Sequence, residues 1–220
     1  MNGDFEPSRL GTKTHWDQVY ENELQKYKDI GDVGEVWFGY DSVERVLDWI
    51  EEKEEVPKDA PILDLGCGNG ITLVELYERG YQRLTGLDYS EQAIELAKNI
   101  AKDKQQDITY KTTDILDGDR LKKDISEQYR LVLDKGTYDA ISLNPEGPEL
   151  NRKKYVENVG LLLQPDGLLI LTSCNWTEEE LQSQFTEDKG FKFYAKIKTP
   201  SFQFGGATGS REACVIFQKL

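Results

Sequence analysis

The sequence predicts an α/β fold in which helices cover both faces of a mostly parallel, seven-stranded sheet. From residue 61 onward, short apolar runs alternate with helical stretches, and turns rich in Gly, Asp or Asn separate them. A parallel crossover has to travel back over the sheet, so this alternation predicts parallel strands. The last two apolar runs have no helix between them, which predicts an antiparallel hairpin at the C-terminus.

The length of 220 residues suits one domain spanning 1–220. Within it we expect a flexible N-terminus over 1–13, a helical cap and lid over 14–60, and an α/β core over 61–220. No run approaches the ~20 apolar residues of a membrane helix, and the opening residues lack the pattern of a signal peptide. We therefore expect a cytoplasmic protein that spans no membrane, with the nucleus open as a second location.

Two helices are expected before the sheet. Residues 14–28 place apolar side chains at helical spacing, and Thr14 with Asp17 resembles a capping box. After a glycine-bearing loop, the spacing over 42–54 predicts the second helix, with Asp41 as its N-cap.

The core is expected to contain seven strands. Their ranges are 62–65, 84–88, 108–114, 130–134, 168–173, 191–198 and 212–219. Helices are expected after the GCGNG loop, from Ser90, over 155–163, and from Thr177 as an N-cap.

The strongest chemical signal is the segment DLGCGNG (64–70) directly after an expected strand. Its glycines permit unusual backbone angles and let a ligand lie against the main chain. Asp88 ends the next strand, where a carboxylate can accept both hydroxyl groups of a ribose. This combination predicts a ligand that contains a nucleoside.

Two details favour S-adenosylmethionine (SAM) over a nicotinamide dinucleotide. The dinucleotide pattern G-x-G-x-x-G/A needs Gly or Ala where this chain has Ile71. Asp64 would repel a pyrophosphate, whereas it suits the ammonium group of a methionine. A nicotinamide oxidoreductase remains an alternative, because that class also uses glycines and an acid about 20 residues further on.

Charge and composition argue against several other ligands. The net charge is −14, from 27 Lys and Arg against 41 Asp and Glu, which repels nucleic acid and attracts cations or simply keeps the protein soluble. Cys67, Cys174 and Cys214 show no CxxC spacing, and His15 is the single histidine. We therefore expect neither a disulfide framework nor a metal site.

These motifs together resemble the class I, seven-β-strand SAM-dependent methyltransferases, which have a Rossmann-like fold. More narrowly, the chain resembles the eukaryotic elongation factor 1-alpha lysine methyltransferase 2 (Efm4-type) family. The general motifs are ILDLGCGNG, LTGLDYS, Asp114 and QPDGLLILTS. The narrower motifs, which span Leu10 to Leu220, are LGTKTHWDQVYENEL, GEVWFG, LDKGTYDAISLNP, LTSCNWTEEEL, PSFQFGG and VIFQK.

The resemblance implies a set of cofactor-binding residues. They are Asp64, Gly66, Cys67, Gly68, Gly70, Asp88, Tyr89, Asp114, Ile115, Trp37, Phe38 and Gly39. In this set Tyr89 stacks on the adenine, and Asp114 with Ile115 addresses the adenine edge. A helix N-cap is the alternative role for Asp114. The segment 37–39 would form a lid over the cofactor and the acceptor entrance, together with aromatic residues of the first helix.

Asp134 is the candidate catalytic residue. It begins the segment DKGT (134–137) at the end of the fourth strand, where the resemblance implies that it accepts a hydrogen bond from the acceptor amine and orients its lone pair. The alternatives are a helix cap or a partner for Lys135. The N-P-P-Y type motif of enzymes that methylate amide or adenine nitrogens is missing, and Asn144-Pro145 is interpreted as a turn.

The activity implied is SAM-dependent methylation of a lysine on elongation factor 1-alpha by a monomeric enzyme. Three alternatives stay open from the residues alone. The enzyme could act on a small-molecule amine or carboxylate, the chain could be a non-catalytic scaffold that keeps the SAM fold, or it could be the oxidoreductase considered above.

Overall fold

A computed structural model of the chain describes residues 5–204 and 207–220. Residues 1–4 of the expected N-terminal segment lie outside the described residues, as do Gly205 and Gly206 of the segment PSFQFGG. Among the described residues, no helix combines the length and the apolar character needed to cross a bilayer.

The elements follow one another in the order that the strand and helix patterns predict, with additions. The strands of the main sheet are β1 (Pro61–Leu65), β2 (Arg83–Asp88), β3 (Thr109–Thr112), β4 (Tyr129–Lys135), β5 (Leu163–Ser173), β6 (Phe191–Ile197) and β9 (Ala213–Lys219). The helices are α1 (Lys13–Ile30), α2 (Tyr40–Glu51), α3 (Ile71–Glu78), α4 (Glu91–Asp103), α5 (Gly118–Asp124), α6 (Thr137–Ser142), α7 (Pro148–Leu162) and α8 (Glu178–Gln184). Short 3₁₀ turns are η1 (Arg9–Gly11) and η2 (Glu187–Lys189).

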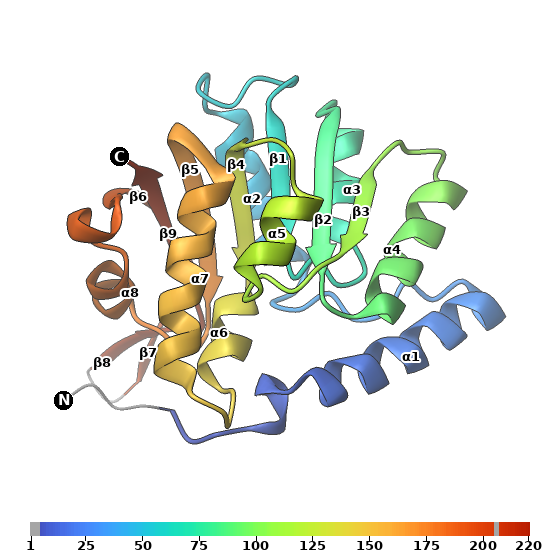
Figure 1. The fold of residues 1–220 in the computed structure, drawn as a ribbon, viewed down its shortest axis with the longest axis horizontal. Coiled ribbons are helices and arrows are strands. Elements are labelled where there is room, and N and C mark those ends of the chain that lie inside the picture. The colour runs from blue at the N-terminus through green and yellow to red at the C-terminus, as the bar shows by residue number, and fades with distance from the viewer. Residues whose placement is uncertain (1–4, 205–206) are drawn as a thin grey trace.

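The main sheet has seven strands in the order β3-β2-β1-β4-β5-β9-β6, with helices on both faces (Figure 1). Strands β1 to β5 pair in parallel, whereas β9 runs antiparallel to both β5 and β6. The predicted fold class and the C-terminal antiparallel pair are therefore confirmed. The segment between β6 and β9 also contains a separate two-stranded ribbon of β7 (Ser201–Phe204) and β8 (Ala207–Ser210), which the sequence pattern did not predict.

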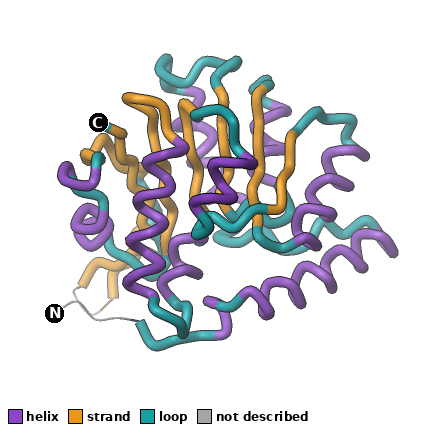
Figure 2. The backbone as a smooth tube through the Cα atoms, in the orientation of Figure 1, coloured by secondary structure: helices purple, strands orange, loops and turns teal. Residues whose placement is uncertain are grey.

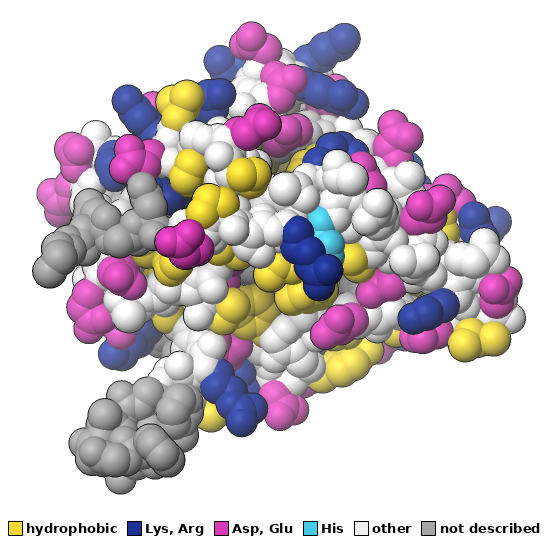
Figure 3. Space-filling view, turned by 90° about the horizontal axis from the view of Figure 1, so that it is seen from below, with side chains coloured by type: hydrophobic (Ala, Val, Ile, Leu, Met, Phe, Trp, Pro, Cys, Tyr) yellow, Lys and Arg dark blue, Asp and Glu magenta, His cyan; other side chains and the backbone are white. Residues whose placement is uncertain are grey.

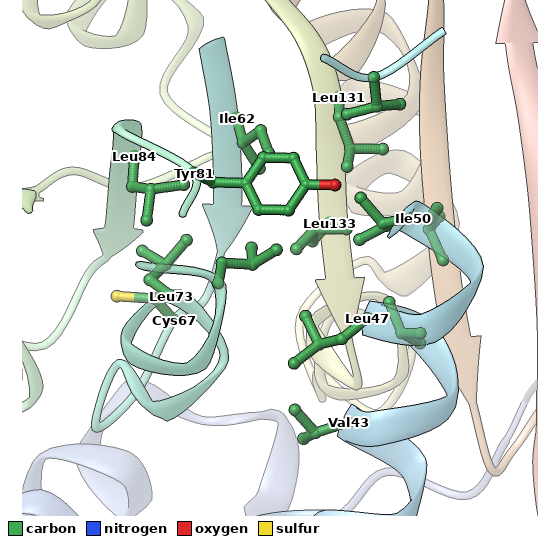
Figure 4. Close-up of a cluster of buried hydrophobic side chains, with 14 of the residues drawn as sticks. Val43, Leu47, Ile50, Ile62, Cys67, Leu73, Tyr81, Leu84, Leu131 and Leu133 are labelled. Atoms are coloured by element: carbon green, nitrogen blue, oxygen red, sulfur yellow. The ribbon is translucent and has the colours of Figure 1, made fainter. Parts of the chain in front are cut away.

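Two hydrophobic layers fix the helices on the sheet. On one face, Val43, Leu47 and Ile50 of α2 pack against the strands, together with side chains from α3 and α4 (Figure 4). Their spacing of four and three residues places them on one side of the helix. On the opposite face, α5, α6, α7 and α8 cover the sheet, with Tyr155 and Val159 of α7 fully buried. The sheet is thus buried on both sides, as parallel sheets require.

Helix α1 begins earlier than expected. Thr12 is its N-cap, and the Thr12 hydroxyl accepts a hydrogen bond from the amide of His15. Thr14 lies inside the helix, and Asp17 pairs with Lys13 at 2.6 Å. The predicted capping box of Thr14 and Asp17 is therefore wrong, because the helix begins two residues earlier, after Thr12.

Two other helix starts were also predicted. Helix α2 is preceded by Gly39, with Asp41 in its first turn, so the prediction of Asp41 as the N-cap is wrong. Helix α8 starts as predicted: Thr177 and Glu180 form a complete capping box. A capping box satisfies two amides that would otherwise lack partners.

The segment that precedes α1 lies against the domain. The amide of Ser8 donates to the carbonyl oxygen of Leu143 at 3.0 Å, and the ring centroids of Phe5 and Trp176 are 4.8 Å apart. A Cβ atom on Gly11 would lie 2.3 Å from the backbone nitrogen of Asn144. Within the expected flexible N-terminus, Ser8 and Gly11 thus lie against the end of α6, and Phe5 lies against the residue before the N-cap of α8.

Candidate active site

The predicted site residues come together at one edge of the sheet. Strands β1, β2 and β4 are parallel, and the register pairs Leu65 with both Leu87 and Asp134. The carboxyl ends of these parallel strands meet at one edge of the sheet (Figure 1 and, in the same orientation, Figure 2). The register therefore brings the glycine loop, Asp88 and Asp134 to the same edge. Figure 3 looks onto this edge, where hydrophobic side chains gather near the centre and acidic side chains are scattered around them.

Three positions of the loop after β1 favour glycine, and one of them is Gly70, with a φ angle of 75°. Gly66 and Gly68 have φ angles of 62° and 54°, in the left-handed region. A Cβ atom on Gly66 would lie 2.0 Å from the hydroxyl oxygen of Thr137, and one on Gly68 would lie 2.3 Å from that of Tyr20. The bare backbone of this loop therefore faces two hydroxyl groups at close range, one from α6 and one from α1.

Asp88 joins the glycine loop to the next helix. Its carboxylate oxygens accept hydrogen bonds from the amides of Gly68 at 3.0 Å and Ser90 at 2.9 Å. Burial raises the pKa of Asp88 to about 6, because the charged form loses its hydration. Each carboxylate oxygen has two lone pairs, so both oxygens retain an acceptor position. This donor and acceptor set fits the two hydroxyl groups of a ribose.

Asp64 is a buried acid near a partly buried base, Lys135. Burial raises the pKa of the Asp64 carboxyl group to about 7, while the nearby Lys135 ammonium acts in the opposite direction. Burial also lowers the pKa of Lys135. An acid and a base close together suit a zwitterionic ligand such as the amino-acid end of a methionine. The sequence reasoning predicted Asp64 for the ammonium group but gave Lys135 no ligand role.

Cys67 contributes its backbone to this region. Its thiol points into the hydrophobic core beside Leu73 (Figure 4), and burial raises the pKa of the thiol well above its usual value. The Cys67 amide donates to the carbonyl oxygen of Leu87 at 2.9 Å. The side chain of Cys67 is therefore a packing group, and only its main chain lies on the ligand side of the loop.

The predicted adenine-side residues follow β2 and β3. Tyr89 is half-buried, and the Lys13 ammonium of α1 lies 5.5 Å from the centre of its ring. The Asp114 carboxylate accepts a hydrogen bond from the amide of Leu116 at 2.8 Å. Asp117 is the N-cap of α5, so the helix-cap alternative for Asp114 is wrong.

Ile115 lies in the hydrophobic core beneath this side of the site. Its carbonyl oxygen accepts a hydrogen bond from the side-chain amide of Asn158 at 2.6 Å. The Ile115 side chain thus packs against the sheet, and its contribution to a ligand site would come from the backbone.

Asp134 is held by protein donors on both oxygens. It accepts hydrogen bonds from the amides of Thr137 at 2.9 Å and Tyr138 at 3.0 Å, and from the hydroxyl group of Tyr155. The side chain is 1% exposed, and burial raises its pKa to about 7. Asp134 thus accepts from the first two amides of α6, although Gly136 occupies the N-cap position. Its predicted action on an acceptor amine stays a prediction.

The predicted lid residues 37–39 lie beside the end of β4. Phe38 has a φ of 66°, unusual for a bulky residue, in a turn closed by a 2.8 Å hydrogen bond from the Gly39 amide to the Val36 carbonyl. A Cβ atom on Gly136 would lie 2.9 Å from the Phe38 ring. Phe38 therefore faces the segment DKGT, where the fourth strand ends.

The other aromatic lid residues pack on one another. The ring centroids of Trp37 and Trp16 are 5.0 Å apart, and the Trp16 indole donates to the carbonyl oxygen of Leu10 at 2.7 Å. Trp16 of α1 thus packs between Trp37 and the segment that precedes the helix. Thr137 belongs to the motif DKGT but was not among the predicted site residues. Its hydroxyl group donates a hydrogen bond to the carbonyl oxygen of Leu65 at 2.7 Å.

The fold and this arrangement define a class I methyltransferase, the class that takes its methyl group from SAM. A profile of the methyltransferase domain family matches residues 57–212. The chain is 45% identical to EEF1A lysine methyltransferase 2 of Homo sapiens, over 98% of this chain and 89% of the human protein. It is 42% identical to the protein-lysine N-methyltransferase efm4 of Schizosaccharomyces pombe, over 96% and 94% of the two chains. The chain therefore belongs to the EEF1A lysine methyltransferase 2 and Efm4 family.

Solved structures agree with this fold at low sequence identity. The magnesium protoporphyrin IX methyltransferase of Synechocystis superposes with a TM-score of 0.64 at 15% identity, covering 96% of this chain and all of that one. The N-methyltransferase NodS of Bradyrhizobium japonicum gives a TM-score of 0.64 at 18% identity, covering 93% and 98%. The seven-stranded methyltransferase fold is thereby confirmed.

Proposed function

We propose that this protein is a SAM-dependent protein-lysine N-methyltransferase whose substrate is elongation factor 1-alpha. The observation that carries the proposal is its similarity, over nearly the whole length of both chains, to relatives named for this activity. The acidic surface supports it, since a net charge of −14 attracts a cationic side chain and a basic partner.

In this proposal the cofactor lies along the carboxyl ends of β1 to β3. Asp88 takes the ribose hydroxyl groups, Asp64 takes the methionine ammonium group, and Tyr89 stacks on the adenine. The remaining residues assigned to the cofactor are Gly66, Gly68, Gly70, the backbone of Cys67, Asp114 and the backbone of Ile115. We assign the predicted lid residues 37–39 to the methyl-transfer side.

SAM supplies a methyl group activated on a sulfonium, and transfer is an in-line displacement. The protein's task is to hold a neutral amine about 3 Å from the reacting carbon. A lysine has an ordinary pKa near 10.4, and desolvation lowers that value. The Phe38 ring beside Gly136 provides an apolar wall that excludes water from the incoming amine. Asp134 fixes the start of α6, and with it the position of the segment DKGT.

We also propose that the protein acts as a monomer in the cytoplasm, without nucleic acid. The net charge of −14 supports the last point, because it repels phosphate backbones. The cysteines support the location, since Cys67, Cys174 and Cys214 are all free thiols.

A methylation assay tests the proposed substrate. We expect the purified protein to transfer labelled methyl groups to a lysine of purified elongation factor 1-alpha, located by mass spectrometry, and to leave a pool of small amines and carboxylates unlabelled. Labelling of the metabolites alone would favour the small-molecule alternative. SAM binding by calorimetry without transfer to any acceptor would favour the scaffold.

The buried acids predict pH-dependent cofactor binding. The ligand groups bind the charged forms of Asp64 and Asp88, whose pKa values burial raises to about 7 and about 6. Binding should therefore release protons, and affinity should rise as the pH is raised from about 5.5 to 7.5. An α-amino group has an ordinary pKa of about 7.7–8.0, so the methionine amine stays mostly charged in this range.

Calorimetry at several pH values, in two buffers with different ionisation enthalpies, measures both the affinity and the protons released. Asp64→Asn is the matched control, because it removes the titrating carboxyl group and should flatten the profile between pH 6 and 7.5 by about one proton equivalent. Proton uptake on binding, or equal affinity across the range, would contradict this assignment.

A further inference from the structure

Asn69 connects the glycine loop to a distant segment of the chain. The connecting segment between α1 and α2, residues 32–39, is called the lid segment here. The side-chain amide of Asn69 donates to the carbonyl oxygens of Val33 at 3.0 Å and Glu35 at 3.2 Å. Its side-chain oxygen accepts a hydrogen bond from the amide of Ile71 at 3.3 Å. One buried side chain, 7% exposed, thus holds two loops together.

A second contact fixes the same part of the lid segment to α1. The Glu23 carboxylate accepts a hydrogen bond from the Glu35 amide at 3.1 Å. A Cβ atom on Gly34, which has a φ of 85°, would lie 2.3 Å from the other Glu23 oxygen. The three residues 33–35 are therefore held between α1 and the glycine loop.

The position of residues 33–35 sets the position of Phe38. Only two residues separate Glu35 from Phe38, and the turn after Val36 is closed by the Gly39 amide. Phe38 then lies against Gly136 at the end of β4. A shift of residues 33–35 would consequently move the aromatic ring beside the segment DKGT.

The glycine loop end of this connection lies next to the predicted ribose site. The amide of Gly68, the residue before Asn69, is bonded to Asp88. A ligand that stabilises Asp88 and the loop also stabilises the anchor of the lid segment. Binding at one site can then order the other without a direct contact between them.

We propose that Asn69 is a positioning residue that couples cofactor binding to the acceptor side of the site through the lid segment. The inference rests on the proposed cofactor site. SAM binding orders residues 32–39, which places Phe38 against Gly136 before the protein substrate enters. Asn69 itself touches neither the methyl group nor the acceptor.

Asn69→Asp is the sharpest test, because the two side chains have the same shape. The variant keeps an oxygen for the Ile71 amide but turns a second oxygen toward the Val33 and Glu35 carbonyls, which are also acceptors. Loss of two buried hydrogen bonds predicts a roughly five- to hundredfold rise in the KM for the protein acceptor. The Kd for SAM should change by less than about threefold, within the effect of one weak contact.

Hydrogen exchange over residues 32–39 distinguishes a loss of this coupling from a general loss of stability. In the wild type, SAM should slow exchange over residues 32–39; in Asn69→Asp, exchange there should be faster without ligand and should respond little to SAM. Asn99→Asp is the matched control, since it makes the same charge change on α4, outside both loops. It should keep wild-type exchange and KM.

Three outcomes would overturn the proposal. The first is that SAM does not slow hydrogen exchange over residues 32–39 of the wild type. The second is that Asn69→Asp shows the same exchange as the wild type over these residues. The third is that Asn69→Asp has the same KM for the protein acceptor as the wild type. The first outcome is measured on the wild type, so the proposal can be refuted even if Asn69→Asp folds poorly. Failure of the cofactor assignment itself would look different, because the wild type would then show no SAM binding by calorimetry.

Discussion

Replacing Asp134 by Asn is expected to lower turnover by about 10²-fold and to reduce thermal stability at the same time. Asp134 accepts hydrogen bonds from Thr137, Tyr138 and Tyr155 with both oxygens. Asparagine keeps one oxygen and turns an amide toward the remaining donors. A buried donor without a partner costs about 1–3 kcal/mol, or roughly 2–4 °C in Tm for each kcal/mol in a chain of this size.

The matched control for Asp134→Asn is Tyr155→Phe. That variant removes one donor and keeps the Asp134 carboxyl group with both of its oxygens, so it should lose stability with a much smaller loss of turnover. Turnover is compared well below both melting transitions, with saturating SAM. If Asp134 only caps α6, the two variants should lose turnover in proportion to their loss of stability.

The kinetic pattern separates the roles of Asp134 further. A group that acts on the reacting amine lowers kcat and kcat/KM together, whereas lost ground-state binding raises KM alone. Wild-type turnover in Asp134→Asn would contradict the prediction. So would a large loss of SAM affinity with normal turnover at saturating cofactor, because Asp134 would then belong to the cofactor site.

The strands and long helices could be predicted because local patterns determine them. Apolar runs bounded by turn residues mark β1 to β5, and the four-and-three spacing in 42–54 marks α2. The short helices α5 and α6 were not predicted. They have 7 and 6 residues and little periodicity of their own. Helices of this length depend on tertiary packing, here of Leu121, Tyr138 and Ile141 against the sheet.

The ribbon of β7 and β8 was not predicted, because its strands are short. Its two strands have 4 residues each and are separated by glycines, so no alternating pattern extends far enough to indicate a strand. Within the described part of the chain, the two strands pair only with each other, in a sheet separate from the main one.

Only those parts of the candidate site that lie in a continuous sequence motif could be predicted. The glycine loop and Asp88 follow strands directly, so the topology alone brings them together. Contacts between distant segments leave no such local trace. The link from Asn69 to Val33 spans 36 residues, and that from Thr137 to Leu65 spans 72. The buried state of Asp134 likewise depends on Tyr155, a residue of another helix.

Replacing Asp88 by Ala is expected to weaken SAM binding by roughly five- to a hundredfold. A ribose whose buried hydroxyl groups lose their acceptor costs about 1–3 kcal/mol in binding. The same substitution leaves the amides of Gly68 and Ser90 without their partner, so the glycine loop should also become less ordered. The largest effect is therefore expected on cofactor affinity.

Calorimetry with SAM measures the loss in Asp88→Ala, and Asp107→Ala is the matched control. Asp107 is exposed between α4 and β3, so its removal changes the net charge equally without touching the site. At saturating SAM, the KM of Asp88→Ala for the protein acceptor should rise less than that of Asn69→Asp, because Asn69 keeps its hydrogen bonds to Val33 and Glu35. An unaltered SAM dissociation constant would refute the ribose assignment. An equal loss in Asp88→Ala and in Asp107→Ala would instead point to the overall acidic field as the source of affinity.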